Sequence, residues 1–325
     1  MRHTTEPQPP SWHRPLLVMS VLMAAVAAVA AVGLVVDDRT LLAESVWAKP
    51  LKFGVSFAVY GLTLGALVPM LPRARRTMWW LGTAFAATGV VDVGFIVLAA
   101  ARGTYSHFNQ NTDPVNAIGQ QVFSSGVVGL FGVSLVIAVM LLFQRVGDVA
   151  LTRALRAGLL LATGGMAVAF GIAGAGPSRT VPDAYGRPVT LAGAHGVGTP
   201  DGGGMPLTNW SVTGGDLRVP HFVGLHAIQV LVLFASALGF AAARVVWLRD
   251  PGVRARLTGV SVLGVTGVFA ITTWQALRGQ PLVHPDGLTW GAVGLLAVLT
   301  GGLALAVVAD ARRRVGPPSP DLVRA

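Results

Sequence analysis

Apolar runs of membrane-spanning length recur along the chain and are separated by polar connections. A helix rising 1.5 Å per residue needs about 20 apolar residues to cross the hydrocarbon core of a bilayer. The runs occupy approximately residues 15–36, 49–71, 78–101, 117–143, 155–174, 221–246, 257–277 and 288–309. They lack the alternation of a membrane β-barrel, and a helix pairs its backbone polar groups within itself. The pattern therefore predicts an all-α polytopic transmembrane bundle of about eight spans.

Arginines divide the connections into two alternating sets. The basic set holds Arg14, Arg73, Arg75, Arg76, Arg145, Arg153, Arg156, Arg244, Arg249, Arg254, Arg256, Arg312, Arg313 and Arg314. The alternate connections hold fewer basic residues, so the positive-inside rule places the basic set in the cytoplasm. Both termini are therefore predicted to be cytoplasmic. This divides the chain into a cytoplasmic leader at 1–14, a transmembrane bundle at 15–310 and a cytoplasmic tail at 311–325.

Composition supports a membrane protein and excludes several other classes. Hydrophobic residues make up 53% of the chain and charged residues 12%, about half the charged fraction of a soluble domain. The lipid bilayer is therefore an expected partner. The net charge of +10 does not indicate nucleic-acid binding, because the basic residues lie in short clusters between apolar runs. The chain has no cysteine, which excludes disulfides, iron–sulfur clusters and cysteine-bound zinc.

One predicted outer connection, residues 176–220 between spans five and six, is unusually long. It is rich in glycine and proline and contains His195 and Asp216. Loops of this length are commonly functional lids or disordered segments. Its glycine triplet is not a phosphate-binding loop, because no Gly-Lys-Ser/Thr follows it. We expect this connection to cap the outer half of the bundle.

Asp92 is the strongest single candidate for function. No other acidic residue lies so deep in a predicted span, about 13 Å below the outer surface at helical rise. A bare carboxylate at that depth is costly, so we expect it to be protonated or paired with Lys52, His226 or an outer arginine. Intramembrane acids commonly mark proton or ion paths. The alternative is a structural ion pair.

Histidines form the second candidate group. Those beyond the leader all map to predicted outer loops or outer helix ends: His107, His195, His221, His226 and His284. His226 lies about 7 Å deeper than His221 and about 140° around the same helix. The two therefore do not form the i, i+4 pair that binds zinc from one helix. An equally weighted alternative is that His226 is satisfied by a serine, glutamine or carbonyl of a neighbouring helix.

These residues leave three functions open. We expect an outward-facing polar cavity formed by Lys52, Asp92, His107, Gln120, His221, His226, Gln229 and Gln275. The first hypothesis is redox chemistry with haem b held by His226 and either His107 or His221, or a divalent metal held by His195, His221 and Asp216. The second is a proton-coupled transporter of a small solute that uses Asp92 with Lys52 or His226. The third is a non-catalytic scaffold or sensor.

Three segments carry a resemblance to other proteins. They read WAKPLKF at 47–53, RGTYSHFN at 102–109 and PHFVGLHAIQ at 220–229. The chain resembles a group of multi-pass membrane proteins of high-GC actinobacteria that has no established function. The resemblance implies a multi-pass protein of a bacterial plasma membrane, and it supplies no catalytic residues.

Overall fold

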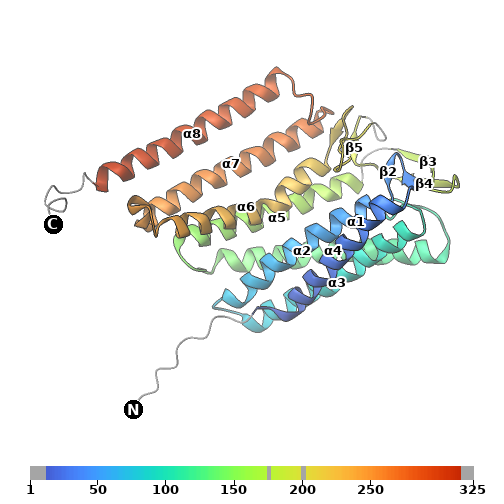
Figure 1. Cartoon of the computed structure of the whole chain (residues 1–325), viewed down its shortest axis with the longest axis horizontal. Coiled ribbons are helices and arrows are strands. Elements are labelled where there is room, and N and C mark those ends of the chain that lie inside the picture. The colour runs from blue at the N-terminus through green and yellow to red at the C-terminus, as the bar shows by residue number, and fades with distance from the viewer. Residues whose placement is uncertain (1–11, 174–176, 199–202, 316–325) are drawn as a thin grey trace, which may run out of the picture. The chain divides into compact units, whose positions relative to one another are not determined.

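A computed structural model describes residues 12–173, 177–198 and 203–315, and it confirms the prediction of eight spans. Eight helices in these ranges are long and apolar enough to cross a membrane. They are α1 (Arg14–Val36), α2 (Ala48–Leu67), α3 (Arg75–Ala101), α4 (Pro114–Leu142), α5 (Val149–Ala173), α6 (Arg218–Ala241), α7 (Pro251–Leu277) and α8 (Gly287–Val315) (Figure 1). The first eleven residues of the predicted leader and residues 316–325 of the predicted tail lie outside the described residues.

Several helix bounds differ from the predicted runs by up to six residues, and the region before α7 shows why. The apolar pattern predicts a sixth span to residue 246 and a seventh from 257. In the structure α6 ends at Ala241, a short 3₁₀ helix η2 (Val246–Arg249) follows, and α7 begins at Pro251. The Asp250 side chain caps α7 by accepting the Gly252 N–H at 2.7 Å, and Pro251 suits the first helical position. The arginines in the first turns of α7 masked this start in the apolar pattern.

The chain divides into two compact units, which are described separately. Unit 1 comprises the described parts of Met1–Gln144 and Ser178–Ala192, and unit 2 those of Arg145–Pro177 and Gly193–Ala325. In unit 1, α1 packs along α2, α3 packs along α4, and α3 also contacts α1 and α2. Their buried side chains include Leu16, Met19, Leu64, Met78 and Ile96.

Unit 2 is built around the pair α5 and α6. Helix α7 packs on both of them, and α8 contacts α7 and η2 (Figure 1). The α5–α6 crossing is close because two glycines meet: a Cβ on Gly224 would lie 2.6 Å from the Gly165 Cα. Small residues allow such backbone approach between membrane helices. A second core joins η2 to the ends of α7 and α8 through Leu248, Val253 and Ala311.

The 176–220 connection contains β structure that the sequence analysis did not predict, and its parts belong to different units. Strands β3 (Ser178–Pro182) and β4 (Pro188–Ala192) form an antiparallel hairpin in unit 1, with Ser178 opposite Ala192. Strands β5 (Gly196–Val197) and β6 (Gly215–Asp216) pair in unit 2. Unit 1 also contains a small hairpin of β1 (Thr40–Leu41) and β2 (Glu44–Ser45).

The β3–β4 hairpin is fastened to the α3–α4 connection by backbone hydrogen bonds. The Gln110 N–H donates to Thr190 O and the Ala192 N–H donates to Phe108 O, each at 2.9 Å. Tyr105 and Phe108 pack on the buried side chains of the hairpin, which are Val181, Val189 and Leu191. This part of the connection is therefore an ordered element of unit 1.

Candidate functional site

Asp92 lies in the middle of α3, buried within unit 1. Its exposed fraction is 2%, and neither carboxylate oxygen has a hydrogen-bond partner. The carboxylate points at α4, where a Cβ on Gly126 would overlap it. The missing side chain at Gly126 therefore creates the space that the carboxyl group occupies. Sequence analysis identified Asp92 from its depth, but nothing in the sequence indicated that Gly126 faces it.

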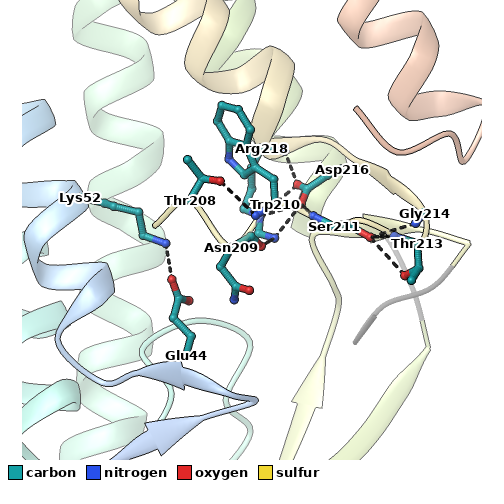
Figure 2. Close-up of polar contacts among 10 residues, drawn as sticks. All are labelled: Glu44, Lys52, Thr208, Asn209, Trp210, Ser211, Thr213, Gly214, Asp216 and Arg218. Atoms are coloured by element: carbon teal, nitrogen blue, oxygen red, sulfur yellow. Dashed lines mark hydrogen bonds and ion pairs between the residues drawn. The ribbon is translucent and has the colours of Figure 1, made fainter. Parts of the chain in front are cut away.

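An ion pair with Lys52, one of the three partners suggested for Asp92, does not form. The Lys52 ammonium contacts the Glu44 carboxylate at 2.5 Å instead (Figure 2). Glu44 lies on β2, in the hairpin that precedes α2, so the turn of the chain between α1 and α2 places an acid beside the first turns of α2. The positive charge of Lys52 is thereby balanced by Glu44 near the end of α2, where burying a charge costs less than in the middle of the membrane.

Aromatic side chains separate Asp92 from the α3–α4 connection. Phe95, three residues nearer that connection on α3, occupies the space left by Gly119. The Phe95 and Phe123 rings lie 6.3 Å apart, and the Phe123 ring lies 4.2 Å from the imidazole of His107. The predicted site residues His107 and Asp92 therefore belong to the same unit, with phenylalanines between them.

A second buried polar position in unit 1 lies nearer the other end of the helices. The Tyr60 hydroxyl on α2 and the Ser134 hydroxyl on α4 are buried without a partner in hydrogen-bond geometry. The Tyr60 ring stacks on Phe85 of α3 at 5.5 Å. Sequence analysis missed both residues, because a lone Tyr and a lone Ser in an apolar helix give no distinctive pattern.

His221 of unit 2 is held by a backbone hydrogen bond. Its Nδ1 lies 2.7 Å from the carbonyl oxygen of Gly165, at the close crossing of α5 and α6. Because a carbonyl can only accept, Nδ1 carries the proton and Nε2 is the remaining ligand atom of the neutral ring. Phe222 contacts both histidine rings of this helix, 5.4 Å from His221 and 6.2 Å from His226.

Asp216 is the centre of a polar cluster in the 176–220 connection. Its carboxylate accepts the Ser211 N–H at 2.8 Å and pairs with the Arg218 guanidinium at 2.6 Å (Figure 2). The Leu217 N–H donates to the His195 carbonyl oxygen at 3.2 Å. These bonds connect β6, the start of α6 and the segment before β5.

The predicted metal site is not assembled. In the described parts of the chain, no group of three or more His, Asp or Glu side chains could hold a metal ion. Of the proposed ligands His195, His221 and Asp216, the acid is already bound to Arg218 and His221 is bound to Gly165. Of the two proposed haem pairs, His226 and His107 belong to different units, whereas His226 and His221 lie on the same helix, α6. The haem pairing and the shared polar cavity therefore remain predictions.

Two carboxylates outside the spans, Asp37 and Asp183, have arginine partners and lowered pKa values. Hydrogen bonds from Arg39 and then Trp47 hold the pKa of the Asp37 carboxyl well below its usual range. Burial raises the pKa of Asp183, but hydrogen bonds from Arg187 and from the Tyr185 N–H outweigh it, and the net shift is downward. These acids stabilise loops as anions, in contrast to the partnerless Asp92 carboxyl.

Comparison with known proteins adds no further assignment. No protein-family model, curated protein sequence or solved structure matches the chain.

Proposed function

We propose that this chain is a multi-pass protein of a bacterial plasma membrane that couples proton binding at Asp92 to the passage of a small solute. The observation that carries the proposal is a carboxyl group in the middle of a membrane-spanning helix, 2% exposed and without a hydrogen-bond partner. A structural acid such as Asp216 instead has its charge balanced by an arginine, here Arg218.

The cost of charge at this depth gives the group its proposed role. An ionised carboxylate without a partner in hydrocarbon costs several kcal/mol, so the neutral, protonated acid is the form that this site accommodates. Release of the proton requires access to water or to a cation. The proton occupancy of Asp92 is thereby coupled to any rearrangement of α3 against α4 that opens the site, because only the open arrangement tolerates the anion.

The contact with Gly126 supports a movable interface. The carboxyl group fits against a backbone position that has no side chain, so a small shift of α4 along α3 would change what surrounds the carboxyl. Neither the arginine-bound Asp216 nor the glutamate-bound Lys52 offers such freedom. This is why proton-coupled transport is favoured over the two other functions that the sequence left open.

Infrared difference spectroscopy on detergent-purified protein tests the proton site without knowledge of the solute. We expect a carbonyl band of a protonated buried carboxyl that titrates with pH and is absent in Asp92→Asn. Asp113→Asn is the matched control, because Asp113 is an outer acid of the same unit that is paired with Arg102. Persistence of the same band in Asp92→Asn would refute the assignment.

Transport is tested in proteoliposomes that contain a pH-sensitive dye. Addition of candidate small solutes to wild-type protein should cause proton movement for at least one of them, and Asp92→Asn should abolish it while Asp113→Asn keeps it. Solute movement that is equally fast in Asp92→Asn and insensitive to an imposed pH gradient would contradict proton coupling.

A further inference from the structure

One end of unit 2 presents arginines that have no acidic partner. Arg244 follows α6, Arg249 ends η2 and Arg312 lies in the last turns of α8, and all three are exposed. Among the described residues none of the three forms an ion pair. Other arginines of this end do have partners, since Arg254 contacts Asp148 and Arg256 contacts Asp310. Exposed Arg313 likewise forms no ion pair among these residues, so the three are distinguished by their position around η2.

The fold gathers this set around η2. The Arg312 guanidinium lies 5.9 Å from the ring centroid of Trp247, in the middle of η2. Arg244, three residues before Trp247, lies 5.2 Å from the ring of Phe240. Leu248 anchors η2 in a buried core that includes residues of α7 and α8. The positions of the arginines thus follow from packed secondary structure.

Apolar surface adjoins the positive charge. Phe240 is 71% exposed and lies four residues before Arg244, and Val246 is 52% exposed and directly precedes Trp247. The N–H donors of an arginine guanidinium bind phosphate oxygens in a bidentate way. Tryptophan indole groups are enriched at the lipid–water boundary of a membrane. A ligand that binds both the arginines and the adjoining apolar side chains carries a phosphate group and a hydrocarbon tail.

We propose that Arg244, Arg249, Arg312 and Trp247 bind the headgroup of an anionic phospholipid, with its acyl chains along Phe240 and Val246. The arginine-rich ends are the predicted cytoplasmic ends, where anionic lipids attract basic residues. This site is independent of Asp92, which belongs to unit 1. Each arginine near an anionic surface contributes about 1 kcal/mol, which corresponds to roughly fivefold in affinity.

The test is native mass spectrometry of the full-length protein with phosphatidylglycerol or phosphatidylcholine added to the detergent. We expect the wild-type chain to retain phosphatidylglycerol, and Arg244→Gln, Arg249→Gln and Arg312→Gln each to weaken retention by roughly fivefold. Arg313→Gln is the matched control, because it removes the same charge from the next residue of α8 and should have less than half that effect. Unfolding temperatures measured without added lipid should be equal in all variants.

Three outcomes would overturn the proposal. Equal losses in Arg312→Gln and Arg313→Gln would show a general positive field in place of a site. Equal retention of phosphatidylcholine would remove the requirement for an anionic headgroup. Displacement of phosphatidylglycerol by an equal concentration of inorganic phosphate would show an anion site that does not use the acyl chains.

Discussion

The two units use glycine in opposite ways at their helix crossings. In unit 1, Gly126 leaves room for the side chain of Asp92, so a polar group occupies the gap between α3 and α4. In unit 2, Gly165 and Gly224 bring two backbones together, and the carbonyl exposed at the crossing accepts a hydrogen bond from His221. The comparison teaches that a glycine in a membrane helix acquires its role from the residue that faces it. At the α5–α6 crossing the packing leaves no space for a side chain beside Gly224, whereas at the α3–α4 crossing it leaves room for one carboxyl group beside Gly126.

Gly224→Ala should give the largest effect, because its new Cβ would meet backbone that cannot rotate away. The Cβ would lie 2.6 Å from the Gly165 Cα, so the helices must separate and the His221 bond must lengthen. We expect a loss of about 1–3 kcal/mol in unfolding free energy, measured by thermal unfolding in detergent. Gly239→Ala on the same helix is the control, since its Cβ meets no atom within 4 Å. Equal stability of the two variants would contradict the close crossing.

A double-mutant cycle at Gly126 and Asp92 tests the α3–α4 crossing of unit 1 and should give an effect of intermediate size. Gly126→Ala places a methyl group against the carboxylate, and we expect a loss of about 1–2 kcal/mol. Asp92→Ala removes the obstacle, so the double variant should recover part of that loss, with a coupling energy of about 0.5–3 kcal/mol. Gly129→Ala, whose Cβ meets nothing within 4 Å, is the control. Strict additivity would show that the two residues do not meet.

The smallest effect is expected at the ion-paired outer acids. Asp183 has a folded-state pKa below its unfolded value, so its stabilising contribution is complete above the unfolded pKa of about 3.9 and is lost as the pH falls through the folded value. Arg187→Gln removes one partner and should cost about 0.2–1 kcal/mol near neutral pH, with little added loss in acid. Thermal unfolding over a pH series measures this, and Arg313→Gln serves as the control. A loss that grows in acid would contradict the sign of the shift.

The positions of the helices could be predicted from the sequence more fully than the contacts between them. The lengths of the apolar runs alone predict eight spans, because the thickness of the bilayer fixes how many apolar residues a spanning helix needs. The start of α7 was misplaced, since Arg254 and Arg256 lower the apolar signal of turns that are nonetheless helical. Asp92 could be found from its depth, but Lys52, one of the three partners suggested for it, pairs with Glu44 because a two-residue β pair brings that acid to the lysine. Such pairings depend on the path of short loops, which carry no periodicity.

The β3–β4 hairpin has a consequence for the order in which the protein can be made. Its residues belong to unit 1, yet the ribosome delivers them after α5, the first helix of unit 2. Until then the Gln110 N–H and the Phe108 carbonyl lack the hairpin partners that they have in the finished protein. Unit 1 therefore cannot be completed during synthesis before the first helix of unit 2 has been made. The two units are therefore interleaved in the order of synthesis.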